Sequence, residues 1–213
     1  MQIIANWTNR TWNLGNWNPA PVMLPDGRVR IMAHTDWAGW AGETILEAPN
    51  YKGPYTVKTG DELDACAFCE EDPFMWVDKR GNWHALYHRM FDPAGPLDPN
   101  WGKEDGSWNR TGSPVPVPGW SGAHSFSRDG LTGWSPLNRC WNTTMAMTDG
   151  SNVELARRER PKLLIQDGVP THLFNGAMAY PAPKGRDGGS ITYTAVTPLN
   201  VKANIDNSGE VST

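Results

Sequence analysis

Short runs of alternating apolar and polar side chains recur along the chain, separated by turns that contain glycine. The clearest case is residues 71–88, where an acidic pair precedes a proline, an apolar run follows, and a turn at Gly81 leads into a second run. In the second run Trp83, Ala85 and Tyr87 occupy every other position. A period of two is typical of β-strands, so this segment predicts an antiparallel hairpin with polar groups at its open end.

Two further segments, residues 18–34 and 159–175, follow the same order of proline, apolar run, glycine turn and second run. With Pro21, Pro73 and Pro161 taken as equivalent, the turn glycine follows the proline by six, eight and seven positions. The polar end of the second run follows the proline by thirteen, fifteen and fourteen positions, at His34, His88 and Asn175. In this alignment only the turn changes length. Repeats of about 40–50 residues built from short antiparallel strands are typical of a β-propeller, in which each repeat is one blade.

The repeats therefore predict an all-β fold, a partial β-propeller of about three blades within one domain, residues 1–213. We expect the blades at about residues 18–60, 66–140 and 155–213. A polar segment rich in Pro and Gly, at about 91–119, interrupts the second blade and is long enough to form a functional rim. A proline would stop the one short helical signal within about two turns, so no long helix is expected.

The composition, with 22 Gly, 18 Pro and 12 Trp, suits a turn-rich β-protein, and tryptophan serves both blade packing and stacking on sugar rings. The net charge of −4 and the pI of about 5.7 give no basic surface for nucleic acid. No apolar run approaches the ~18 residues of a membrane span. We therefore expect neither nucleic acid nor a membrane as a partner.

Four segments fit the acceptor pattern of N-glycosylation, at Asn6, Asn9, Asn109 and Asn142. They predict an extracellular glycoprotein or one of the secretory pathway. The first six residues lack the basic start and the apolar stretch of a signal peptide, so we expect further sequence upstream of Met1.

One metal-like spacing occurs, in which Cys66-x2-Cys69 is followed by His84-x3-His88. The context argues against a zinc finger, because the intervening residues are acidic and the histidines fall in a strand-like run. The repeat also accounts for His88 through its counterpart His34. A disulfide or buried thiols are the other interpretations of the cysteines, whose odd number leaves one thiol over. We expect no metal and no cofactor.

Asp72 and Glu159 each stand just before a hairpin, and equivalent positions of propeller blades converge on the central axis. We expect both carboxylates in one cavity, with Asn18 of the first blade. Glycoside cleavage needs such a pair, one acid to protonate the leaving oxygen and another to assist. The alternative is that each acid caps a strand or pairs with an arginine. Arg158 and Arg160 flank Glu159, and nearby cations lower a carboxyl pKa, but strand alternation should point both away from it.

Further polar and aromatic side chains are candidates for holding a sugar near the axis. Histidines can bind hydroxyl groups, and Trp17, Trp37 and Trp40 can stack on a sugar ring, although a structural role is the more common one for any single residue of either kind. The substrate-binding candidates are Asn18, Glu71, His88, His124, Arg158 and Asn175.

Four short motifs together resemble the five-bladed β-propeller glycosidases of the arabinanase, levansucrase and invertase superfamily, and within it glycoside hydrolase family 43. These motifs are Asn18-Pro-Ala-Pro, Glu71-Asp72-Pro73-Phe74, the segment 123–130, and Arg158-Glu159-Arg160-Pro161. The resemblance covers residues 16–200, roughly. It implies that Glu159 is the general acid and that Asp72 is the second acidic residue, which orients the acid and tunes its pKa.

The sequence departs from this family at the third carboxylate, the base or nucleophile. Asn18 occupies an equivalent position at the start of a blade but cannot act as a base. The base therefore lies upstream of Met1, or the chain is a degenerate relative that binds carbohydrate without cleaving it. A sialidase is a third interpretation, because residues 127–134 resemble an Asp-box turn, although Gly130 directly follows Asp129.

The resemblance implies a secreted glycoside hydrolase that acts on plant or algal polysaccharides or oligosaccharides, with arabinofuranosyl, xylosyl or galactosyl linkages as the expected targets. A carbohydrate is the expected partner. We expect the 213-residue form to lack activity, because it lacks the third carboxylate. The competing expectation is a carbohydrate-binding propeller without catalysis.

Overall fold

The computed structural model describes residues 3–4, 15–37, 40–59, 70–89, 121–179 and 191–199. Within these ranges the secondary structure consists of strands. Their bounds are β1 (Ile3–Ile4), β2 (Gly15–Met23), β3 (Val29–Trp37), β4 (Trp40–Ala48), β5 (Tyr55–Thr59), β6 (Glu70–Val77), β7 (Trp83–Arg89), β8 (Gly122–Ser127), β9 (Asn138–Trp141), β10 (Thr144–Ala146), β11 (Asn152–Gln166), β12 (Val169–Ala179) and β13 (Thr192–Pro198). Across the part of the chain described here, no helix is long and apolar enough to cross a membrane.

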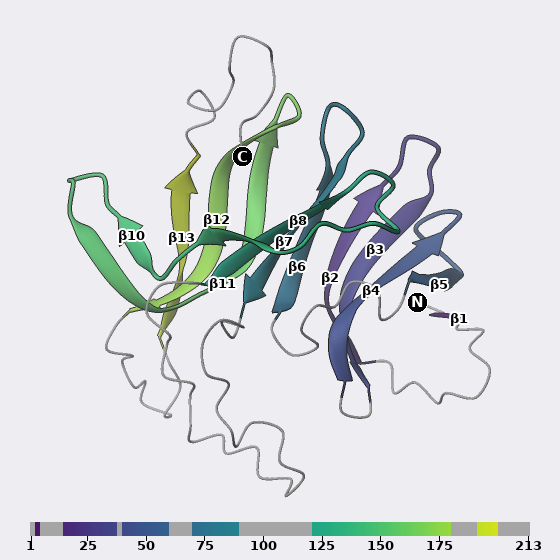
Figure 1. Ribbon diagram of the computed structural model, residues 1–213, viewed down its shortest axis with the longest axis horizontal. Coiled ribbons are helices and arrows are strands. Elements are labelled where there is room, and N and C mark those ends of the chain that lie inside the picture. Colours follow the sequence, from purple (N-terminus) through teal and green to yellow (C-terminus); the bar gives the residue numbers. More distant parts are fainter. Residues whose placement is uncertain are drawn as a thin grey trace, which may run out of the picture.

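The strands form three sheets that lie side by side, as Figure 1 shows. Their strand orders are β1-β5-β4-β3-β2, β6-β7-β8-β9 and β10-β11-β12-β13. Neighbouring strands are antiparallel except for β1 and β5. The middle sheet meets the other two through β6, which contacts β2 on one side and β11 on the other. This arrangement confirms the predicted all-β fold, a partial propeller in which each sheet is a blade.

The strands β2, β6 and β11 each carry a β-bulge, in which two residues oppose one on the neighbouring strand. The first residue of the pair has a positive φ, 54° at Asn18, 55° at Asp72 and 53° at Arg160. The second residue is always a proline. A proline is tolerated at a bulge because the bulged residue does not donate a ladder hydrogen bond.

The bulges correct the repeat alignment drawn from the sequence. The proline equivalent to Pro73 and Pro161 is Pro19, not Pro21. Glu159 is equivalent to Glu71, since both directly precede the bulge, whereas the counterpart of Asp72 is an arginine. The residues opposite the position before the bulge follow the proline by fifteen places in every blade, at His34, His88 and Gly176, so Asn175 is not the third member of that set.

Apolar side chains between neighbouring sheets hold the blades together. Met32 and Ile45 of the first sheet are fully buried and pack against Met75, Trp83 and Ala85 of the second. A second cluster joins the middle and third sheets and is formed by Leu86, Trp141, Leu173 and the partly buried Phe74, Trp76, Leu163 and Leu199. Both interfaces lie beside β6, so they fix that strand between its two neighbours.

A turn after β8 adds a polar tie between the first two blades. The carboxylate of Asp129 accepts hydrogen bonds from the backbone N–H groups of Leu131 and Thr132, each at 2.8 Å. Its backbone carbonyl accepts a hydrogen bond of 2.5 Å from Arg30, whose guanidinium also lies 4.4 Å from the ring centre of Trp83. The segment that resembles an Asp box therefore has a structural role, because it links the second blade to the first.

Candidate active site

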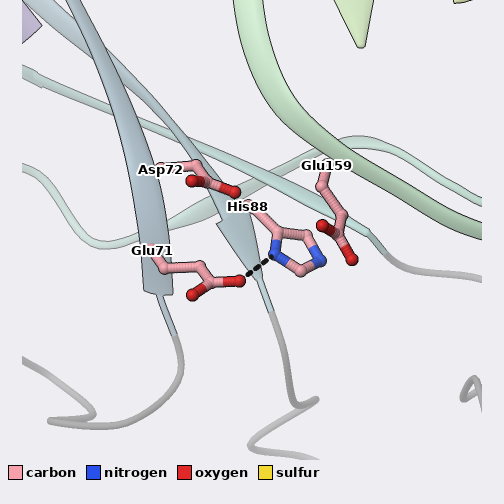
Figure 2. Close-up of side chains that lie close together, drawn as sticks. All are labelled: Glu71, Asp72, His88 and Glu159. Atoms are coloured by element: carbon pink, nitrogen blue, oxygen red, sulfur yellow. Dashed lines mark hydrogen bonds and ion pairs between the residues drawn. The ribbon is translucent and has the colours of Figure 1, made fainter. Parts of the chain in front are cut away.

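Four ionisable side chains converge where β6, β7 and β11 meet. Glu71 and Asp72 come from β6, His88 from β7 and Glu159 from β11. Each offers one nitrogen or oxygen atom, and these atoms all lie within 4.8 Å of one another. Figure 2 shows the three carboxylates and the imidazole pointing toward one another. We call these four residues the acidic cluster. The structure thus brings together Asp72 and Glu159, as the sequence predicted.

Asp72 is the most deeply buried member, with 2% of its surface exposed. Its Oδ1 lies 3.6 Å from the Nε of Arg160, and its Oδ2 has no hydrogen-bond partner in the structure. Burial raises the pKa of Asp72 above its usual value, and the charge of Glu71 raises it further, against the opposing effects of His88 and Arg160. This carboxyl group therefore holds a proton more readily than an exposed aspartate does.

The environment of Glu71 shifts its pKa in the direction opposite to that of the adjacent Asp72. Its Oε1 lies 3.1 Å from Nδ1 of His88. This hydrogen bond lowers the pKa of Glu71 more than burial raises it, and the nearby His34 and Arg160 lower it further. Neighbouring carboxyl groups with pKa values pushed apart can take different parts in acid–base chemistry.

Glu159 is held in place through the backbone around it. Its carbonyl oxygen accepts a hydrogen bond of 3.2 Å from Nδ2 of Asn175. The preceding carbonyl, that of Arg158, accepts from the hydroxyl of Ser121 at 2.5 Å and from the indole of Trp141 at 3.1 Å. Ser121 and Trp141 carry no signal in the sequence for this role, because their partner is a backbone carbonyl rather than a side chain.

Arg157 and Arg158 are arranged around Glu159 as strand alternation requires, although only its two immediate neighbours were considered from the sequence. Arg158 does point away, as expected, and Arg160 reaches Asp72 instead. Arg157, however, donates to Oε1 of Glu159 at 3.2 Å. Residues two apart in a strand share a face, so the cation to expect beside Glu159 is the second one before it.

Two predicted substrate-binding residues bond to each other inside the third blade. Arg158 and Asn175 are 4% and 1% exposed, and Nε of the arginine donates to Oδ1 of the asparagine at 3.0 Å. Arg158 also donates to the carbonyl of Asn142 and the hydroxyl of Thr197, at 3.2 and 2.6 Å. These bonds support β11 behind Glu159.

His124 lies apart from the acidic cluster. Its Nε2 is 3.0 Å from Nδ1 of His84, whose Nε2 is 3.3 Å from a carboxylate oxygen of Asp78. Burial, and then the neighbouring His84, lower the pKa of His124 to about 4. His84 and His88 are four residues apart on β7, about 13 Å in an extended strand, so one zinc ion cannot bind both.

Of the remaining candidates, the structure describes the side chains of some and not of others. Asn18 is exposed at the bulge of β2, and its place beside Asp72 and Glu159 stays a prediction. Three tryptophans and two cysteines named above have side chains outside the described part of the chain, namely Trp17, Trp37, Trp40, Cys66 and Cys69. Cys140, on β9, is an exposed free thiol.

Three adjacent blades, with acidic side chains of the second and third gathered where β6, β7 and β11 meet, define part of a β-propeller. The endo-arabinase from Bacteroides thetaiotaomicron VPI-5482 is similar, with a TM-score of 0.51 and 17% sequence identity over 87% of this chain and 57% of that one. The GH43_1 enzyme from Xanthomonas citri, solved with xylose, has a TM-score of 0.51 and 12% identity over 85% of this chain and 51% of that one. The second of these two proteins is by its name a family 43 glycoside hydrolase.

These likenesses establish the fold. The chain has the architecture of part of a family 43 propeller and spans about half the length of the solved structures it matches, 57% and 51% of the two above. No protein-family model and no curated protein matches the sequence.

Proposed function

We propose that this chain is the part of a secreted glycoside hydrolase that supplies the proton donor, with Glu159 as the general acid and Asp72 as the residue that orients it. The observation that carries the proposal is the convergence of both carboxylates, from neighbouring blades, within 4.8 Å. The likeness of the fold to family 43 enzymes supports it.

The exposure of the two side chains supports different roles for the two acids. The side chain of Glu159 is 16% exposed and that of Asp72 is 3% exposed, so Glu159 is the one that can touch a substrate. The exposed Arg157 must release Oε1 of Glu159 when a glycosidic oxygen takes its place. Asp72, the more deeply buried of the two, then keeps Glu159 in position. Because its pKa is raised, Asp72 also limits the negative charge of the acidic cluster.

The short separation argues against one role for this pair, that of the acid and base of an inverting enzyme. An inverting enzyme keeps its acid and base about 6.5–9.5 Å apart so that a water molecule fits between them. Asp72 and Glu159 are closer than that, so neither serves as the inverting base for the other. A complete enzyme needs a further carboxylate, and we propose that a longer polypeptide supplies it and that the 213-residue form alone is inactive.

The substrates we propose are glycans with arabinofuranosyl, xylosyl or galactosyl linkages. The test compares Glu159→Gln with the unchanged protein in a polypeptide extended upstream by about one blade. Loss of the proton should reduce turnover by roughly 10²–10⁴ on substrates with poor leaving groups and by less on activated aryl glycosides. Glu154→Gln on the same strand is the control, because Glu154 bonds to Thr143 and Thr144 outside the cluster. Equal losses on both kinds of substrate would refute the role of Glu159.

A second candidate, a carbohydrate-binding propeller without catalysis, rests on Asn18. The bulge of the first blade carries an amide where the second blade carries the carboxylate of Asp72. This candidate predicts that the extended polypeptide binds arabino-, xylo- or galacto-oligosaccharides in calorimetry and cleaves none of them. Measurable hydrolysis in the same panel excludes it.

A further inference from the structure

Two strands end each of the three sheets, and among the described residues all but one of these edges carry a feature that discourages pairing with another chain. The edges formed by β2 and β6 are broken by a bulge that contains a proline. Those formed by β1, β9 and β10 are two, four and three residues long. Short strands, bulges and prolines are the usual means by which proteins protect sheet edges.

The strand β13 is the exception. It forms an edge seven residues long, and its only proline is the last residue, Pro198. The other six residues carry no charge, and all but one of them are β-branched or aromatic. Thr192, Tyr193, Thr194 and Val196 are exposed to solvent. A short segment with high β-propensity, no charge and no internal proline is typical of a strand that pairs with a further strand.

The backbone of β13 offers hydrogen-bonding groups at this edge. The N–H of Leu199, directly after the strand, donates to the carbonyl of Thr171 beside β12 at 2.8 Å. Bonded pairs alternate along an antiparallel ladder, so the odd-numbered residues of β13 bond to β12. The N–H and C=O groups of the even-numbered residues Thr192, Thr194 and Val196 therefore point to the outer edge of the sheet.

The side chains on the other face of β13 hold this strand in place. Ala195 is 4% exposed and packs against Leu155 and Ala177 of the third blade. The hydroxyl of Thr197 accepts a hydrogen bond of 2.6 Å from the buried Arg158. A strand that is already fixed loses little conformational freedom when another strand pairs with it, which favours association.

We propose that β13 pairs antiparallel with β13 of a second copy of this chain, so that two third blades form one continuous sheet. A second copy fits because the strand has no charge with which to repel itself, and a twofold axis makes such an edge self-complementary. An axis through Thr194 places Thr194 opposite its own copy and Thr192 opposite Val196. Each outward N–H of these three residues then faces a carbonyl, and Ala195 lies opposite the larger Tyr193.

This pairing ends at two copies, because each chain uses its one such edge. It also leaves the acidic cluster open. Figure 1 shows β13 on the side of β12 away from β6, and Glu159 lies on β11, two strands from β13. The inference goes beyond the proposed function, and since pairing requires no hydrolysis, the two proposals fail separately.

The test measures the mass of the 213-residue chain by analytical ultracentrifugation from micromolar to submillimolar concentration. A seven-residue edge buries less area than a standard interface, so we expect a reversible dimer that grows with concentration. Amide exchange by nuclear magnetic resonance then reports the surface used. Exchange at Thr192, Thr194 and Val196 should slow several-fold as the dimer forms, whereas the amides of Tyr193 and Ala195, which bond to β12, should be protected throughout.

Two variants act on the edge alone. Thr194→Pro removes an outward N–H without removing a bond to β12, and Val196→Lys adds a charge, so each should weaken dimerisation by about 10-fold or more. Met23→Lys is the control, because Met23 is 68% exposed on β2 of the first blade, and this variant should dimerise as the unchanged chain does. Circular dichroism checks the folding of each variant.

A chain that stays monomeric over the whole concentration range overturns the proposal. A dimer that both edge variants leave unchanged, or that forms without slowing exchange at Thr192, Thr194 and Val196, uses another surface and overturns it as well. Assemblies that grow beyond two copies would contradict a closed twofold pairing. If Thr194→Pro does not fold, Val196→Lys and the exchange pattern of the unchanged chain decide the outcome.

Discussion

Asp78, in the turn between β6 and β7, should make stability depend on pH. Its Oδ1 accepts hydrogen bonds of 2.8 Å from the backbone N–H groups of Arg80 and Asn82, and its Oδ2 accepts one of 3.1 Å from the Asn82 side chain. Oδ2 also lies 3.3 Å from Nε2 of His84. Burial alone would raise the pKa of Asp78, but these bonds outweigh it and lower the pKa from 3.8 to about 2.

The shift converts into a free energy of unfolding. A pKa difference of this size corresponds to about 2.5 kcal/mol, which we reduce to about 1–2 kcal/mol because the carboxylate is partly exposed and screened by solvent. The folded-state pKa is below the unfolded value, so the stabilisation is present in full above about pH 4 and is lost as the pH falls toward 2. Roughly half of it should be gone at pH 3.

The assay is urea unfolding of the unchanged chain and of Asp78→Asn at pH 7 and pH 3, with fluorescence detection. The variant should be less stable by about 1–2 kcal/mol at pH 7, and the difference should shrink by about half at pH 3. Asp149→Asn is the control, because Asp149 accepts one backbone bond of 2.9 Å in a fully exposed turn. A difference between the unchanged chain and Asp78→Asn that stays constant with pH would refute the reasoning.

Two further predictions concern packing and modification. Gly122→Ala places a Cβ 2.0 Å from the ring of Trp141 and should cost about 1–3 kcal/mol in urea unfolding. Gly176→Ala should cost less, because the nearest atom to its Cβ is the Glu159 carbonyl oxygen at 3.9 Å, and equal losses for the two variants would contradict this reasoning. Asn142 is exposed, so after secretion from a eukaryotic host, mass spectrometry of its peptide should find an N-linked glycan, and an unmodified peptide would count against secretion through that route.

The sequence predicted the hairpins well because their signals are local. In the segment 71–88 the expected turn forms, with the backbone N–H of Asp78 donating to Asn82 at 2.8 Å and that of Gly81 donating to Asp78 at 3.0 Å. Alternation over a few residues, with glycine at a positive φ of 86° in the turn, is enough to fix such a unit. The meeting of Asp72 and Glu159 was instead predicted from the repeat, because equivalent positions of propeller blades converge on the axis, although the bulges show that these two residues are not equivalent.

The sequence did not predict which faces some residues occupy. Arg158, whose turn away from Glu159 the alternation did predict, and Asn175 were both candidates for binding substrate, yet they bond to each other inside the third blade. Residues one apart in a regular strand point to opposite faces, so a residue beside Glu159 belongs behind it. His124 was expected near the axis, but its partner His84 pairs with the turn residue Asp78 at the other end of the hairpin. Such pairings depend on register between distant strands.

The bulge explains both the error in the alignment and the existence of the acidic cluster. In a regular strand Glu71 and Asp72 would point to opposite faces of the sheet. The positive φ of Asp72 and the shift in register after Glu71 break this alternation, and both carboxylates then reach His88 and Glu159. A pattern with a period of two cannot foresee this, because the bulge adds one residue to only one of the paired strands. The Asp-Pro pair is thus the local sequence feature through which the fold gathers its acids at one point.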